Sequence, residues 1–201
     1  MTYTQTELTE IISTRTCHDL IGNIGTLKNA LDFIGADGVV DAETRNLLET
    51  ASFLLNARQK FFRMAFGIET HAQTLDELLL LCQNYLDTVG TRGHGIKLVF
   101  SGITPQLSKP ICLCVMVAAD IFIKGGEISV AVNKNNIIVH AKTDYKFRES
   151  EILTYQQIIR GEKPNDNISQ YAQLIYLRAL LGEDVPMNLA HTETEMKLVI
   201  G

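Results

Sequence analysis

The chain has 201 residues, of which 46% are hydrophobic, and its formal net charge is −5. This length allows one large domain or two small ones with a substantial core, and the acidic balance argues against a nucleic-acid-binding surface, which requires a basic patch. The longest apolar stretch, residues 111–123, contains Asp120 and is too short to cross a bilayer. The N-terminus has acidic residues and no apolar run, so we expect a cytoplasmic protein without a signal peptide and without a membrane partner.

Residues 4–67 predict two long helices. Apolar residues recur at helical spacing over 4–34, Gly35 and Gly38 supply a stop and a turn, and Asp41 is a good N-cap for a second helix that ends near Gly67. A loop this short makes the two helices antiparallel neighbours. Two helices cannot bury both apolar stripes, so we expect two copies of the hairpin to form a homodimeric four-helix bundle about a two-fold axis.

The rest of the chain alternates between helix and strand patterns. In chain order, we expect helices at residues 74–89, 108–123, 149–160 and 168–181, and strands at 96–100, 127–132, 136–143, 185–192 and 195–201. Thr74 followed by Glu77 forms a capping-box pattern at the start of the first of these helices. The order predicts an α/β sandwich with helices on one face of a mixed sheet. The expected fold class is therefore α+β, with a helical hairpin domain at 1–68 and an α/β domain at 69–201.

His18 is the strongest candidate for chemistry. It lies nearly opposite the apolar stripe of the first helix, which consists of Leu20, Ile24, Leu27, Leu31 and Ile34. It shares its face with small and polar residues, namely Thr14, Gly22, Gly25 and Asn29. Each glycine costs about 1 kcal/mol relative to alanine inside a helix, so we expect another backbone or protein surface to approach this face closely.

The residue types around His18 favour phosphoryl acceptance over a plain surface histidine. A neutral imidazole is a nitrogen nucleophile, and the adjacent Asp19 can reach the ring from the side and hold its tautomer. Cys17, His18 and Asp19 do not form a catalytic triad, because consecutive helical residues point in different directions.

Two segments resemble a known family. Residues 17–31, CHDLIGNIGTLKNAL, resemble the phosphoacceptor box of histidine kinases, in which an acid follows the histidine. Residues 57–67, ARQKFFRMAFG, resemble the end of the second helix in alphaproteobacterial histidine phosphotransferases of the ChpT type. The order of the remaining elements also matches that family, so the resemblance covers nearly the whole chain. The sequence differs at Asn23, where the family usually has proline, and Gly22 and Gly25 are expected to soften the helix instead.

The resemblance implies a dimeric four-helix bundle with His18 as the phosphoacceptor, followed by a domain similar to a kinase ATP-binding domain. It implies a histidine phosphotransferase of a two-component phosphorelay, which passes a phosphoryl group between the aspartates of receiver domains, from a hybrid histidine kinase to response regulators. The receiver brings its own Mg²⁺, so we expect no cofactor or metal site in this chain. The surface expected to dock the receiver shares or borders the face of His18 and consists of Thr14, Arg15, Gly22, Asn23, Gly25 and Asn29.

The second domain lacks the motifs with which kinases of the family bind ATP. Those kinases have an Asn on the first helix, an Asp-x-Gly-x-Gly turn and a glycine-rich lid, whereas here residues 111–122 have no Asn and residues 143–146 have no glycine. Gly161 is the only glycine between Gly126 and Gly182. Backbone amides need such a flexible loop to surround a triphosphate. We therefore expect a degenerate domain that binds no nucleotide, and a phosphotransferase rather than a sensor kinase.

Other candidates are weaker. The four cysteines have no CxxC spacing and are expected to be reduced and structural, and the glycine at position 93 together with His94 and Gly95 indicates a turn. His71, His140 and His191 lack metal-ligand spacing. Arg58 and Arg63 either complement the dipole of their own helix or contact a partner. The alternative function is a non-enzymatic dimeric adaptor that binds response regulators, with an incidental histidine.

Overall fold

The computed structural model describes residues 3–34, 38–68, 71–90, 94–134, 136–164 and 166–201. The helix stop expected at Gly35 and the glycine at position 93 lie outside the described residues. Over the described part of the chain, none of the helices combines the length and the apolarity needed to cross a membrane.

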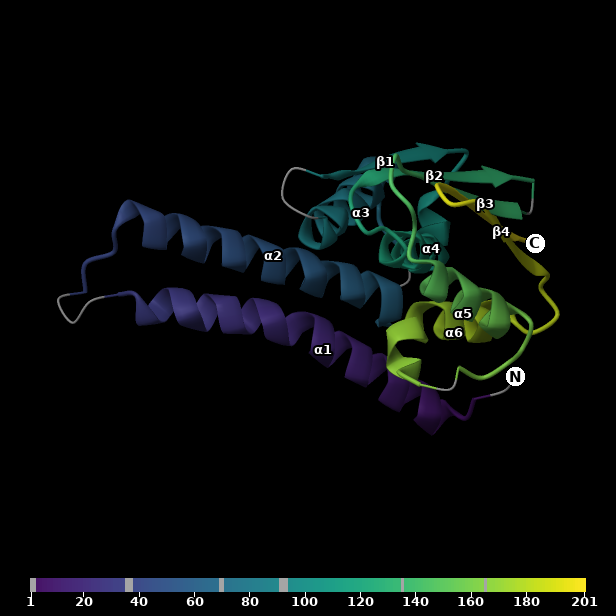
Figure 1. The fold of residues 1–201 in the computed structure, drawn as a ribbon, viewed down its shortest axis with the longest axis horizontal. Helices are drawn as coiled ribbons and strands as arrows, with labels where there is room; N and C mark the ends of the chain where they lie inside the picture. Colours follow the sequence, from purple (N-terminus) through teal and green to yellow (C-terminus); the bar gives the residue numbers. More distant parts are fainter. Residues whose placement is uncertain (1–2, 35–37, 69–70, 91–93, 135, 165) are drawn as a thin grey trace.

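The N-terminal part is a pair of long helices, α1 (Gln5–Asp32) and α2 (Ala42–Phe66), which lie side by side (Figure 1). Thr4 and Glu7 form a capping box at the start of α1, and Asp41 caps α2 by accepting a backbone N–H. Both predicted helices are confirmed to within two residues at each end that the structure describes. The far end of the hairpin extends away from the rest of the molecule (Figure 1).

The remaining chain forms four α-helices and one sheet, within the described residues. The helices are α3 (Leu75–Val89), α4 (Ser108–Asp120), α5 (Glu149–Ile159) and α6 (Ala172–Leu181). The strands are β1 (Ile96–Ser101), β2 (Gly126–Asn133), β3 (Asn136–Lys142), β4 (Met187–His191) and β5 (Glu195–Ile200). Short 3-10 turns, Pro105–Leu107 and Ile168–Tyr171, precede α4 and α6.

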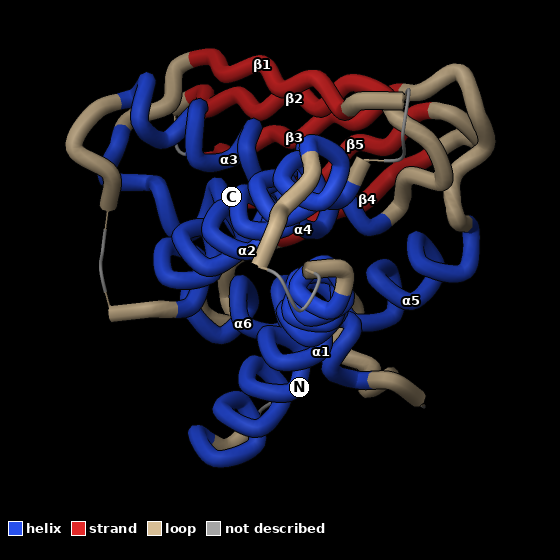
Figure 2. Tube along the Cα trace, turned by 90° about the vertical axis from the view of Figure 1, so that its left-hand side faces the viewer, coloured by secondary structure: helices blue, strands red, loops and turns tan. Residues whose placement is uncertain are grey.

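The sheet is mixed, as the sequence predicts. Its strand order is β1-β2-β3-β5-β4, with β1 parallel to β2 and the other pairs antiparallel. The register aligns Val130, Val139, Leu198 and Leu189 across four strands, and all four are buried. The helices lie on one face of the sheet (Figure 2), so this row of side chains belongs to the face that they cover. The α+β class and the one-sided sandwich are confirmed.

Helix α4 lies at the centre of the core. Every residue from Pro110 to Ala119 is apolar and buried, so this part of the helix has no polar face toward solvent. The base of the hairpin joins the same core: the ring of Phe61 on α2 stacks on Tyr85 of α3, with ring centroids 3.9 Å apart. The hydrophobic core is therefore continuous between the hairpin and the sheet, and the division into 1–68 and 69–201 stays a prediction.

Helix α4 ends earlier than the sequence predicts, at Asp120 instead of residue 123. The carbonyl of Ile121 accepts the backbone N–H of Arg148 at 3.0 Å, and the ring of Phe122 packs edge-on against Phe147. These contacts with the segment before α5 take the place of another helical turn. The early end leaves the Asp120 side chain facing α1.

Much of the apolar surface of the hairpin is not covered within one chain. The large hydrophobic residues exposed on or near it include Ile21, Ile24, Leu31, Phe33, Val39 and Phe53. On α1 the buried residues are Ile11, Arg15 and Ala30, which means that most of the predicted stripe, including Ile24 and Leu31, is left partly or largely open to solvent.

Candidate functional site

His18 lies on α1, and its side chain is 84% exposed. Its Nδ1 is 3.3 Å from Oδ1 of Asp19. This separation is slightly longer than an ordinary hydrogen bond, and such contacts commonly shorten when a substrate binds. Among the described residues, none contacts Nε2 at hydrogen-bond distance, so that nitrogen is open to a docking partner.

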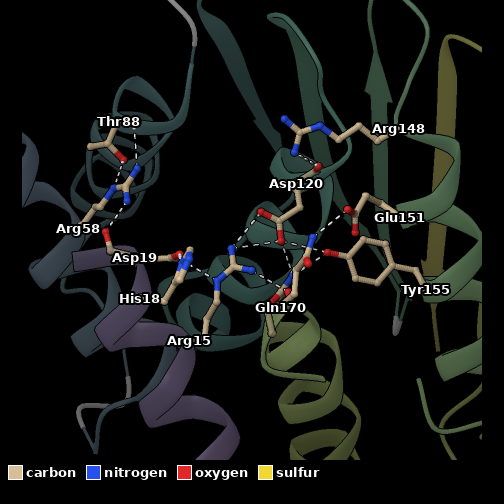
Figure 3. Close-up of polar contacts among 11 residues, drawn as sticks. Arg15, His18, Asp19, Arg58, Thr88, Asp120, Arg148, Glu151, Tyr155 and Gln170 are labelled. Carbon is tan, nitrogen blue, oxygen red and sulfur yellow. Dashed lines mark hydrogen bonds and ion pairs between the residues drawn. The ribbon is translucent and has the colours of Figure 1, made fainter. Parts of the chain in front are cut away.

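Asp19 is held from two sides. Its Oδ2 accepts a hydrogen bond from Nε of Arg15 at 2.7 Å, and its backbone carbonyl accepts one from Nη1 of Arg58 (Figure 3). Arg58 also donates to the hydroxyl and the carbonyl of Thr88, both at 3.0 Å. Arg58 therefore stabilises the C-terminal end of α3 instead of the end of its own helix, and it ties α3 to the turn of α1 that carries the histidine.

Arg15 is buried, with only 9% of its surface exposed. Its Nη1 donates to the carbonyl of Gln170 at 2.7 Å, and its Nη2 lies 3.1 Å from Oδ1 of Asp120. Burial opposes the positive charge, but Asp120 and Asp19 raise the pKa of Arg15, so it stays protonated. The guanidinium therefore makes its hydrogen bonds inside the protein, and the expectation that Arg15 belongs to the docking surface stays a prediction.

Asp120, at the end of α4, is the acceptor at the centre of the buried network. Its Oδ2 accepts hydrogen bonds from the hydroxyl of Tyr155 at 3.1 Å and from the amide of Gln173. Burial raises the pKa of Asp120, and the nearby Arg15 opposes that rise. Through these contacts, side chains of α1, α4, α5 and α6 meet directly beneath the turn that carries His18.

A cavity of about 360 Å³ lies at this junction. Its lining residues are Arg15, His18, Asp19, Asp120, Arg148, Asn167, Ser169 and Gln170. The histidine and its neighbours come from α1, and the other residues come from the α/β domain. His18 therefore stands beside a hollow that both parts of the chain build.

The other residues of the expected docking surface differ in exposure. Thr14, Gly22 and Asn29 are exposed, whereas Asn23 and Gly25 are half-buried. A Cβ placed on Gly22 or Gly25 meets no atom within 4 Å, so none of the described residues of the same chain packs closely against these glycines. The Nδ2 of Asn23 is shielded from solvent and has no hydrogen-bond partner in the described structure.

Other candidate residues do not form a second reactive centre. The described residues contain no cluster of three or more His, Cys, Asp or Glu side chains with metal-binding geometry. All four cysteines are free thiols; Cys17 is exposed, and Cys82 and Cys112 are buried with their sulfur atoms 3.8 Å apart. His140 on β3 lies 3.8 Å from Glu195 on β5, on the face of the sheet that the helices do not cover.

Sequence reasoning missed Asp120, Arg148 and Gln170 as parts of this site. One feature of the sequence points to Asp120, which is the single charged residue in the apolar stretch 111–123. A charge buried in such a stretch requires a partner. Gln170 contacts Arg15 through its backbone carbonyl, which no residue pattern reveals.

No family model and no curated protein matches the sequence. Among solved structures, that of a bacterial phosphotransferase is similar over 100% of this chain and 98% of its own, at 17% identity with a TM-score of 0.78. A histidine kinase from Burkholderia phymatum STM815 is 12% identical, and the match covers 98% of this chain and 97% of its own. The Acinetobacter baumannii histidine kinase AdeS is 13% identical, and the match covers 91% of this chain and 95% of its own. Their TM-scores, 0.40 and 0.39, are too low to support an argument. The chain therefore has, from end to end, the fold of the bacterial phosphotransferase structure.

Proposed function

We propose that this protein is a cytoplasmic histidine phosphotransferase of a two-component phosphorelay, in which His18 carries a phosphoryl group between receiver-domain aspartates. One observation carries the proposal. The imidazole is 84% exposed, its Nδ1 faces the carboxylate of Asp19, and His18 lines the cavity. A histidine held in this way has one nitrogen fixed and the other ready to act as a nucleophile.

The transfer step follows from this geometry. The lone pair of Nε2 attacks the phosphorus of a receiver phosphoaspartate, a P–N bond forms, and the P–O bond to the aspartate breaks, so the carboxylate leaves as an anion. The ring gains positive charge and keeps its Nδ1 proton beside Asp19, whose carboxylate stabilises that charge. In the reverse direction, a second receiver's aspartate takes the phosphoryl group from Nε2. The receiver supplies Mg²⁺, and the transfer depends mainly on alignment and charge.

The fold and the missing nucleotide motifs support a transferase that does not use ATP. The structure that shares this fold over its full length is described as a bacterial phosphotransferase. The α/β domain has no glycine in residues 143–146, where kinases carry their adenine-binding turn. Micromolar binding of a fluorescent ATP analogue would contradict this part of the proposal.

The uncovered apolar residues of the hairpin support a homodimer. Ile24 and Leu31 lie two turns apart on α1, and each is 51% exposed. Pairing two hairpins in a four-helix bundle removes such residues from water. The dimer would carry two phosphoacceptor histidines.

The test is transfer of a radioactive phosphoryl group from a phosphorylated receiver domain to the purified protein. Wild type and His140→Ala, which alters an exposed histidine on β3, should become labelled at equal rates, and His18→Ala should not. Equal labelling of the His18→Ala variant would exclude His18 as the acceptor. If no variant is labelled and receivers still bind the His18→Ala variant, the protein is the non-enzymatic adaptor.

A further inference from the structure

The guanidinium of Arg15 has a protein acceptor for each of its three nitrogens. Nε donates to Asp19 on the same helix, Nη1 to the carbonyl of Gln170 and Nη2 to Asp120 (Figure 3). The two last acceptors belong to the α/β domain. A planar guanidinium that is engaged on all sides has one orientation, so the α/β domain sets the direction in which Nε points.

That direction determines how the carboxylate of Asp19 is presented to the histidine. Because Oδ2 accepts from Arg15 at 2.7 Å, the other oxygen, Oδ1, faces Nδ1 of His18. The Asp19 side chain is only 16% exposed, so few water molecules reach it. Without the guanidinium, the carboxylate would be free to rotate away from the ring.

We propose that Arg15 is a positioning residue for His18, held by Asp120 and the Gln170 carbonyl of the α/β domain so that Asp19 fixes the histidine ring. The inference rests on the proposed function and gives the α/β domain a role in phosphoryl transfer that requires no nucleotide. A carboxylate at Nδ1 holds the proton there and leaves the lone pair on Nε2. The buried network thus selects the tautomer that can attack phosphorus.

The first test measures the tautomer directly in the full-length protein. Long-range ¹H–¹⁵N NMR at about pH 8.5, where histidine is ordinarily neutral, distinguishes a protonated from an unprotonated ring nitrogen, and the His18→Gln spectrum assigns the signal. Wild type should carry the proton on Nδ1 of His18. A wild-type proton on Nε2 overturns the proposal without any further variant.

Arg15→Lys keeps the charge but cannot reach three acceptors with the fork geometry of arginine. We expect it to shift His18 toward the Nε2-protonated tautomer and to slow phosphotransfer on the order of tenfold, the effect usual when a supporting partner of a reactive group is removed. Asp120→Ala should shift the tautomer in the same direction. An unchanged tautomer in folded Arg15→Lys protein overturns the proposal.

Lys109→Met is the matched control, because Lys109 also ties the α/β domain to the hairpin, through a 2.7 Å hydrogen bond to the carbonyl of Gly67. It should leave tautomer and rate unchanged. If it shifts the tautomer as much as Arg15→Lys does, the effect is a general loosening of the fold and the proposal fails.

A double-mutant comparison tests whether Arg15 acts through Asp19. Asp19→Asn should slow transfer, and adding Arg15→Lys to it should cause no further loss. Independent, multiplying losses overturn the proposal. Should even the wild type transfer no phosphoryl group, the proposed function fails, while the NMR measurement still decides whether Arg15 and Asp120 set the His18 tautomer.

Discussion

Arg15 and Asp120 are 105 residues apart in the chain, and their side chains form an ion pair with Nη2 and Oδ1 3.1 Å apart. Their side chains are 10% and 17% exposed. The two partners differ in their other ion pairs. Arg15 also pairs with the carboxylate of Asp19, whereas the ion pair of the Asp120 carboxylate, among the described residues, is with Arg15. Removing the cation therefore leaves two shielded carboxylates, and removing Asp120 leaves Arg15 still paired.

This asymmetry predicts unequal effects of two substitutions on the free energy of unfolding. Arg15→Met should lower it by about 3 kcal/mol, the usual loss when one partner of a buried pair is removed. Asp120→Asn should change it little or raise it, because Oε1 of Gln173 has no partner in the described structure and can accept from the new amide once Gln173 turns over. Urea denaturation at neutral pH measures both. Equal losses would contradict the unequal pairing.

Because the pKa of Asp120 is raised, the difference in the free energy of unfolding between wild type and Asp120→Asn should depend on pH. As the pH falls, folded wild type takes up the Asp120 proton before the unfolded chain does, because burial raises the pKa only in the folded state. The wild type therefore gains stability relative to Asp120→Asn between that raised pKa and the ordinary value near 3.9. Any advantage of Asp120→Asn at neutral pH should shrink as the pH is lowered toward 4. Parallel pH profiles for the two proteins would show that Asp120 is not destabilised by burial.

Local patterns in the sequence were sufficient for most of the fold. The caps at Asp41 and Thr74 are confirmed, because a capping side chain and the N–H that it binds lie within three residues of each other. The order of helices and strands follows from hydrophobic periodicity for the same reason. The end of α4 was misplaced because Arg148 and Phe147, far along the chain, determine where it stops.

Only part of the candidate site could be predicted from the sequence. The exposure of His18 and its contact with Asp19 follow from adjacent positions on one helix. The role of Arg15 does not, since on a helical wheel a charged residue near the polar face looks exposed. Its burial depends on Asp120 and on a backbone carbonyl, and no local pattern encodes a pairing across more than a hundred residues.

Cys17 offers a chemical test of the surface beside His18. It is the exposed thiol, whereas the other three cysteines are buried; burial raises the pKa of Cys112 and raises that of Cys114 to about 12. A maleimide should therefore modify one thiol in the folded protein and four after denaturation. A bulky maleimide on Cys17 should block phosphotransfer from a receiver. The reagent should have no effect on the transfer activity of Cys17→Ser, and fast modification of two or more thiols in folded protein would contradict the burial.

The proposed dimer depends on the apolar surface of the hairpin. Ile24→Asp places a charge among side chains that the bundle would bury, so the mass measured by light scattering should fall from that of a dimer to that of a monomer. Leu80→Asp is the matched control, because Leu80 on α3 is 61% exposed and lies outside the hairpin. A wild-type protein that is already monomeric, or a dimer that survives Ile24→Asp, would contradict this interface.

A substitution at Gly22 should affect protein stability and receiver docking in opposite directions. It lies on the exposed face of α1, one turn from His18, and an added Cβ there meets no atom within 4 Å. Gly22→Ala should therefore raise the free energy of unfolding by about 1 kcal/mol, since alanine favours a helix more than glycine does.

If the glycine is present because a receiver approaches the helix closely, the same substitution should weaken phosphotransfer although it stabilises the fold. The expected signature is a raised midpoint of urea unfolding together with a slower transfer rate at low receiver concentration. Ser13→Ala is the control, because it also places alanine at an exposed position of α1 but away from the face of His18, and it should leave transfer unchanged. Full activity of a stabilised Gly22→Ala protein would mean that the partner does not pack against this face of the helix, and that the docking surface lies on the cavity side of His18.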